Sequence, residues 1–149
     1  MNNTAPISPK VLLVDDNRDG LLVRRLLLEE QGCCVESASN GEEGLKLFEA
    51  GRFDVVVTDY RMPRMNGIEM IACIRRLAPA ARIILISALV EPLGLTEENT
   101  GADAVIGKTV HEPAHLARWV KRLLNRSPAR KPAGSQRSRL VRTARVSAR

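Results

Sequence analysis

Long apolar runs are missing from this chain of 149 residues. None of its apolar stretches approaches the roughly 20 residues that a helix needs to span a lipid bilayer. The first residues, Met1 to Pro9, also lack the basic and then apolar pattern of a secretory signal. These two absences lead us to expect a cytoplasmic protein that does not enter a membrane.

Cysteine and histidine are scarce, with three and two copies. Cys33, Cys34 and Cys73 are odd in number and lack the spacing of metal ligands, so we expect reduced thiols. His111 and His115 have no companions for a metal site, and we expect solvated or helix-capping roles for them. A metal centre built from thiolates or imidazoles is therefore not expected.

Acidic residues are absent from residues 126–149, which hold eight of the 23 Lys and Arg residues. Residues 1–125 hold all 17 Asp and Glu residues, so the net charge of +6 conceals a near-neutral domain with a basic tail. The tail is rich in Pro, Ser, Ala and Gly and has few large apolar residues, a composition typical of disorder. We therefore predict one domain at 1–125 and a disordered tail at 126–149, too short for a second folded domain.

Short apolar runs alternate with helical patterns along the domain. We expect strands at residues 10–14, 33–38, 53–58, 82–86 and 104–106, and helices at 18–31, 40–51, 67–77 and 113–124. Leu22, Val23, Leu26 and Leu27 have helical spacing in the first helix, whereas Pro92 and Gly94 predict a short or irregular fourth helix. Five such repeats predict an α/β fold with a doubly wound parallel sheet of five strands, flavodoxin-like (βα)5, in the order 2-1-3-4-5.

The third predicted strand, rich in valine, ends on a carboxylate, Asp59. Pro63 stiffens the loop that follows, and Asn66 with Glu69 has the spacing of a capping box at the next helix. One carboxylate is thus displayed where a buried strand emerges. In an open α/β sheet this is the edge at which ligands bind.

Other polar side chains follow the remaining central strands. Asp15 and Asp16 follow the first strand, Ser87 the fourth, and Lys108 the fifth. Three carboxylates at one sheet edge repel one another unless a cation lies among them, and an oxygen ligand set suits Mg²⁺. With the hydroxyl of Ser87 and the ammonium of Lys108, these residues predict a site that binds Mg²⁺ and a phosphoryl group.

Four segments carry a resemblance to a known family: residues 11–17 (VLLVDDN), 58–67 (TDYRMPRMNG), 84–88 (ILISA) and 106–108 (IGK). In this order and spacing they resemble the receiver domain of bacterial two-component response regulators, over about residues 9–125. The resemblance implies that Asp59 accepts a phosphoryl group from a phosphohistidine of a sensor histidine kinase or a phosphotransfer protein. It also implies that Ser87 and Lys108 contact the phosphoryl oxygens, and that Mg²⁺ is held by Asp15, Asp16, Asp59 and the backbone carbonyl of Arg61.

Three features depart from the family pattern, all on the face that the family uses for output. Thr109 replaces the usual proline after the lysine, Val105 replaces a frequent aromatic, and Pro92 and Gly94 interrupt the fourth helix. We expect the phosphorylation chemistry to be intact and the peptide bond between Lys108 and Thr109 to be trans.

Three classes of function remain open. The leading prediction is a phosphoacceptor response regulator of a phosphorelay, with output through protein–protein contacts and no enzymatic activity beyond its own phosphotransfer and autodephosphorylation. A second is a Mg²⁺-dependent phosphohydrolase that forms an aspartyl phosphate, although that chemistry needs a second Asp where Asn17 stands. The third is nucleic-acid binding through the tail, which lacks aromatics for base stacking but contains Arg137, Arg139, Arg142, Arg145 and Arg149.

Overall fold

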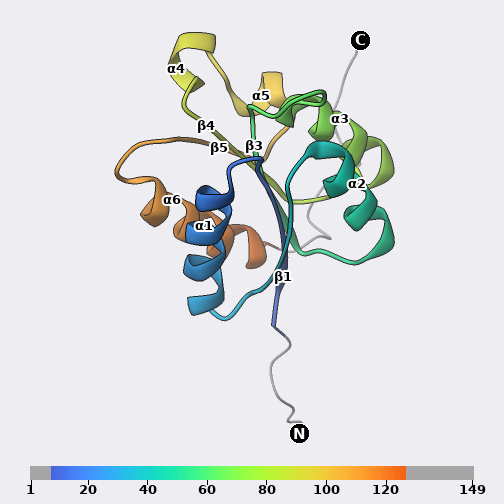
Figure 1. Ribbon diagram of the computed structural model, residues 1–149, viewed down its shortest axis with the longest axis vertical. Helices are drawn as coiled ribbons and strands as arrows, with labels where there is room; N and C mark the ends of the chain where they lie inside the picture. Colours follow the sequence, from blue (N-terminus) through green and yellow to red (C-terminus); the bar gives the residue numbers. More distant parts are fainter. Residues whose placement is uncertain (1–7, 127–149) are drawn as a thin grey trace, which may run out of the picture.

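A computed structural model of the protein describes residues 8–126. A central sheet lies between two layers of helices (Figure 1). The strands are β1 (Lys10–Val14), β2 (Cys34–Ala38), β3 (Val55–Asp59), β4 (Ile83–Ser87) and β5 (Ala104–Gly107). The helices are α1 (Arg18–Glu30), α2 (Gly41–Ala50), α3 (Gly67–Leu77), α4 (Val90–Leu93), α5 (Glu97–Thr100) and α6 (Glu112–Leu124).

All four strand pairings are parallel, and the order is β2-β1-β3-β4-β5, which confirms the predicted doubly wound fold. The chain order reverses between β1 and β3, the central pair of the predicted binding edge. The register aligns Val14 with Thr58 and Ser87 with Gly107, so the carboxyl ends of β1, β3, β4 and β5 lie along one edge. Polar residues that follow these strands are therefore brought to the same end of the sheet.

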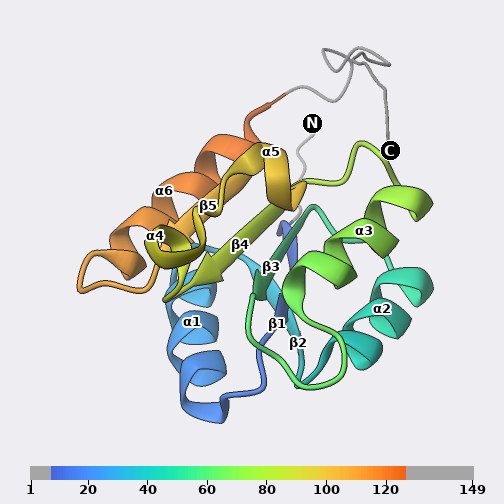
Figure 2. The same cartoon turned by 90° about the horizontal axis from the view of Figure 1, so that it is seen from above.

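Two hydrophobic layers hold the helices against the sheet. Helices α1 and α6 cover one face, and α2 and α3 cover the other (Figure 2). Neighbouring residues of a strand point to opposite layers, so Leu13 packs with Leu28 of α1 while Leu12 packs with Met70 of α3. Every residue of β3 and β4 is buried, as expected of central strands covered on both sides.

The chain between β4 and β5 forms two single-turn helices, α4 and α5, instead of one long helix. Pro92 lies inside α4, and Gly94 ends it with a φ of +61°, a conformation that glycine adopts without a steric penalty. This arrangement confirms the prediction of a short, irregular fourth helix. The same segment lies over β4 and β5 in Figure 2.

The buried face of helix α1 differs from the set of apolar residues whose spacing the sequence analysis noted. Leu22, Val23 and Leu26 are more than half exposed, while Leu21, Leu27 and Leu28 contact the core. Leucines stand on several sides of this helix, so their spacing alone does not determine which side is buried. The side chain of Asn17, which accepts a hydrogen bond from the Gly20 N–H at 2.8 Å, fixes where the helix begins.

The remaining expectations concern thiols, membranes and the chain ends. Cys33, Cys34 and Cys73 are free thiols, as predicted. Within residues 8–126, no helix is long and apolar enough to cross a bilayer. The predicted boundary at residue 125 falls just after α6. The tail predicted to be disordered is 126–149; the structure describes only Arg126 of it, and residues 127–149 lie outside the described part.

Candidate functional site

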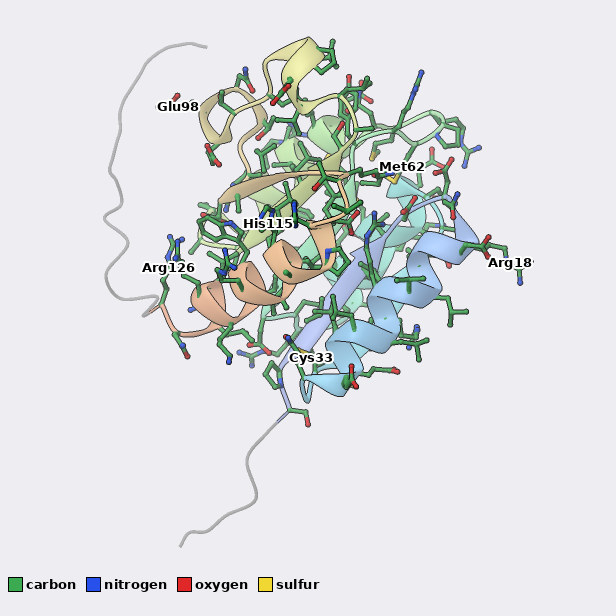
Figure 3. The ribbon with its side chains drawn as sticks, turned by 90° about the vertical axis from the view of Figure 1, so that its left-hand side faces the viewer. Arg18, Cys33, Met62, Glu98, His115 and Arg126 are labelled. Atoms are coloured by element: carbon green, nitrogen blue, oxygen red, sulfur yellow. The ribbon has the colours of Figure 1, made fainter. Side chains whose placement is uncertain are left out.

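The carboxyl edge of the sheet brings three carboxylates together. One ligand oxygen from each of Asp15, Asp16 and Asp59 lies within 4.8 Å of the other two. Asp15 and Asp59 are buried by the strands that they follow or end, whereas Asp16 is exposed. Together with Asn17 and Lys108 they line an open cavity of about 520 Å³, to which the loop after β3 contributes Arg61, Met62 and Pro63. Met62 is labelled in Figure 3.

Lys108 is the counter-charge of Asp59. Its Nζ lies 2.8 Å from Oδ1 of Asp59, whose side chain is only 3% exposed. Among the described residues this oxygen accepts no hydrogen bond of good geometry, so the ion pair is its polar contact. Burial raises the pKa of Asp59 above its usual value, and the charge of Asp15 adds to this, while Lys108 and Arg24 oppose it. The site thus holds a buried carboxylate that a further cation would stabilise.

Arg24 is a second cation beneath the cluster, and the sequence analysis missed it. Its guanidinium is buried, with Nη1 2.5 Å from Oδ2 of Asp15 and Nε 2.8 Å from Oε2 of Glu112 in α6. Burial lowers the pKa of Arg24, but Glu112 and Asp15 outweigh it, so the pKa is raised overall. Arg24 has helical spacing with Leu21 and Leu28, which contact the core, but the neighbouring Arg25 and the exposed leucines of the same helix leave no signal in the sequence that singles Arg24 out.

The loop from β3 to α3 is fixed at its far end by Gly67. Its N–H donates to the carbonyl of Tyr60 at 2.8 Å, so the start of α3 lies directly against the end of β3. Asn66 and Glu69 form the predicted capping box, each side chain accepting from the other residue's N–H at 2.9 Å. Arg64 in this loop has a φ of +68°, a left-handed conformation that is uncommon for residues other than glycine.

Ser87 ends β4, the strand that lies between β3, which carries Asp59, and β5, which Lys108 follows. Ser87 and Lys108 line a neighbouring cavity of about 370 Å³, together with Glu91 of α4 and His115 of α6, which is labelled in Figure 3. The Ser87 hydroxyl accepts a hydrogen bond from the Leu89 N–H at 2.9 Å, and Lys108 N–H donates to the Ser87 carbonyl at 3.0 Å. Ser87 is therefore adjacent to the site, with its hydroxyl engaged in the turn after β4.

The donor set fits a hard divalent cation. Carboxylate oxygens at close range, a buried oxygen of Asp59 without a hydrogen bond among the described residues, and an open cavity suit Mg²⁺, which retains several waters. The cavity also contains Arg61, whose carbonyl is the fourth expected protein ligand. His111 and His115 do not line this cavity; both side chains are exposed, as expected of solvated residues, and His111 precedes α6 without a side-chain hydrogen bond to the helix.

Comparison with known proteins agrees with this geometry. A model of the response regulator receiver domain family matches residues 11–120. A response regulator receiver protein of Anaeromyxobacter sp. (strain Fw109-5) is 39% identical over 108 residues, covering 72% of this chain and 45% of the relative. The chain spans about half the length of such curated relatives.

Two solved structures show the same fold. A CheY-like receiver domain protein of Methanospirillum hungatei JF-1 has a TM-score of 0.73 at 30% identity, covering 80% of this chain and 95% of that one. The response regulator TrrA of Thermotoga maritima, solved with Mg²⁺ and BeF, has a TM-score of 0.67 at 34% identity, covering 77% and 98%. With its sheet order, carboxylate cluster and matching family model, the chain belongs to the receiver domain family of two-component response regulators, whose members are phosphoacceptors.

Proposed function

We propose that this receiver domain is phosphorylated on Asp59 and acts in a phosphorelay through contacts with other proteins. The observation that carries the proposal is the position of Asp59: a buried carboxylate paired with Lys108, with an oxygen that lies within 4.8 Å of an oxygen of Asp15 and of Asp16. The relative from Thermotoga maritima was solved with Mg²⁺ and BeF, which supports the same ligand class here.

In the proposed reaction, a carboxylate oxygen of Asp59 attacks the phosphorus of a phosphohistidine. The new oxygen–phosphorus bond forms as the phosphorus–nitrogen bond breaks, and the imidazole of the donor leaves and takes up a proton. Asp15, Asp16, Asp59 and the Arg61 carbonyl would hold Mg²⁺, which would supply positive charge to the phosphoryl oxygens.

Lys108 and Ser87 complete the proposed site. The Lys108 ammonium, 2.8 Å from Asp59, supplies positive charge to an oxygen of the transferred group. The Ser87 hydroxyl accepts from the Leu89 N–H and keeps its own O–H to donate to another oxygen. Because Ser87 is bonded to the turn between β4 and α4, a new bond from Ser87 to the phosphoryl group alters the surface formed by the shortened helices.

The partner that we propose as phosphoryl donor is a sensor histidine kinase or a phosphotransfer protein. An exposed apolar surface lies beside the site: Leu22, Val23 and Leu26 on α1, and Val110 in the loop after β5, which is 89% exposed. Val23 and Val110 line one shallow cavity together with Arg24 and Glu112. Large exposed apolar side chains next to a reactive carboxylate suit a docked protein better than a small substrate.

A phosphohydrolase activity is disfavoured by Asn17. The second Asp of that chemistry would stand at this position, and here the Asn17 side chain caps α1 by accepting from the Gly20 N–H. We therefore propose that the domain is a phosphoacceptor rather than an enzyme. We also propose that it works in the cytoplasm. Nucleic-acid binding through the basic tail stays an alternative prediction, since it depends on residues 127–149.

The proposal is tested by incubating the full chain with a small acyl phosphate in the presence and absence of Mg²⁺ and measuring its intact mass. We expect a Mg²⁺-dependent, hydroxylamine-labile phosphate on the wild type and none on Asp59→Asn. Phosphate retained by Asp59→Asn would refute the assignment of Asp59. Sustained release of phosphate from a simple phosphomonoester would instead support the phosphohydrolase.

A further inference from the structure

Arg24 connects two parts of the fold that are far apart in the sequence. Its Nη1 donates to Oδ2 of Asp15 at 2.5 Å, while Nε and Nη2 donate to the two carboxylate oxygens of Glu112 at 2.8 Å and 3.3 Å. One planar guanidinium therefore joins the end of β1 to the first turn of α6. A lysine has a single ammonium and lacks this forked geometry.

Both oxygens of Asp15 are already engaged. Oδ1 accepts from the Asn17 N–H at 3.0 Å, and Oδ2 accepts from Arg24. Gly20 leaves room for the pair, since a Cβ atom there would lie 3.0 Å from Oδ2 of Asp15 and 3.4 Å from Nη1 of Arg24. Asp15 is thus held in one orientation, with part of its charge offset by a buried arginine.

We propose that Arg24 is a positioning residue of the phosphorylation site: it sets the affinity of the carboxylate cluster for Mg²⁺ and links that cluster to α6 through Glu112. The inference rests on the proposed function, because it concerns the same cation. Arg24 and an incoming cation are both attracted to the Asp15 carboxylate, so a stronger interaction with Arg24 weakens the binding of the cation.

Glu112 competes with Asp15 for the guanidinium of Arg24 and so weakens the interaction between Arg24 and Asp15. It faces two of the three nitrogens, and its side chain is largely buried beside them. When a cation takes charge from Asp15, the guanidinium is held more strongly by Glu112. Occupation of the site is in this way communicated to the first turn of α6, the helix that also carries the single tryptophan, Trp119.

The test is a calorimetric titration of the full chain with Mg²⁺ alone, for wild type, Arg24→Gln, Glu112→Gln and the double variant. Arg25→Gln is the matched control: it removes the same charge from the next residue of α1, whose guanidinium donates to the Val35 carbonyl and to Oγ of Ser37 in β2. The far-UV spectrum and thermal unfolding without Mg²⁺ establish that each variant is folded.

Removal of one neighbouring charge from a buried site is expected to lower the Kd of Arg24→Gln for Mg²⁺ by about tenfold. In this variant the Asn17 N–H still donates to Asp15 and orients it, so the lost positive charge determines that the Kd falls rather than rises. In Glu112→Gln the guanidinium of Arg24 pairs with Asp15 alone, so the Kd for Mg²⁺ is expected to rise about threefold. In the double variant, which lacks Arg24, the Glu112→Gln substitution is expected to have no effect on the Kd. Arg25→Gln is expected to bind Mg²⁺ like the wild type.

Equal Kd values for Arg24→Gln and Arg25→Gln would overturn the inference while leaving the proposed function intact. A Glu112→Gln effect of the same size with and without Arg24 would also overturn it, since the two residues would then act independently. A wild type that binds no Mg²⁺ would refute both this inference and the proposed cation site. If Arg24→Gln does not fold, Arg24→Met takes its place in the cycle with the same expected result, because methionine also removes the charge and its unbranched, adaptable side chain fills the buried space.

Discussion

Replacement of Gly67 by alanine should displace the end of β3 that carries Asp59. A Cβ atom at Gly67 would lie 2.4 Å from the carbonyl oxygen of Asp59 and 2.8 Å from Cδ1 of Leu85. Real Cβ atoms rarely approach a neighbour closer than 3.4 Å, so the strand end and the helix must separate by about 1 Å. The nearest obstacle is backbone, which cannot rotate away as a flexible side chain can.

The expected cost of this overpacking is about 3 kcal/mol of the free energy of unfolding, at the upper end of small-to-large substitutions in cores. A displacement of about 1 Å at the nucleophile is expected to slow phosphorylation of Asp59 by about 100-fold. Urea unfolding followed by circular dichroism measures the first quantity. The initial rate of labelling by a small acyl phosphate at saturating Mg²⁺ measures the second.

Gly107→Ala is the matched control for this substitution. Gly107 also lies at the carboxyl edge, next to Lys108, but the nearest atom to a Cβ there is Cγ2 of Thr109 at 3.8 Å, an ordinary contact. We expect this variant to lose less than about 1 kcal/mol. If Gly67→Ala matched Gly107→Ala in both stability and labelling rate, the close packing of α3 on β3 would not be what positions Asp59.

Three further predictions concern stability. Burial raises the folded-state pKa of Asp59, so its ionised form destabilises the fold. At neutral pH without Mg²⁺, Asp59→Asn should therefore unfold at a higher urea concentration than the wild type, and this difference should shrink as the pH falls through that pKa. Equal urea midpoints for wild type and variant at neutral pH would contradict this prediction. Leu28→Ala should cost about 3–5 kcal/mol by leaving a cavity in the core, whereas Leu22→Ala on the exposed side of the same helix should stay within about 0.5 kcal/mol in the same urea assay; similar losses would show that the assigned face of α1 is wrong. Asn66→Ala should cost about 1 kcal/mol through loss of the α3 cap, and an unchanged urea midpoint would contradict the role of the capping box.

The strands and the carboxylates of the site were predictable because each has a strong local signal. The valine-rich run of β3 is apolar on both sides of the strand, which predicts a buried strand, and it ends on Asp59, which predicts a carboxylate at the edge of the sheet. Parallel strand order then places Asp15 and Lys108 at the same edge. No side-chain detail was needed for that step.

Helix α1 and Arg24 were not predictable in the same way. The helix has apolar residues on more than one side, so periodicity does not decide between Leu22 and Leu28 as the buried residue. The burial of Arg24 depends on Glu112, which is 88 positions away along the chain and reaches it only through the packing of α6. The engagement of Ser87 with Leu89 likewise depends on the turn after β4, which the spacing of motifs does not describe.

The most direct test of the account identifies the phosphorylated residue chemically. Borohydride reduction of an aspartyl phosphate converts that residue to homoserine, and tandem mass spectrometry of the digested protein then locates it. After treatment with a small acyl phosphate and Mg²⁺, the account predicts homoserine at position 59 alone, and none when Mg²⁺ is removed by a chelator. Homoserine at another aspartate, or at position 59 to the same extent without Mg²⁺, would contradict it.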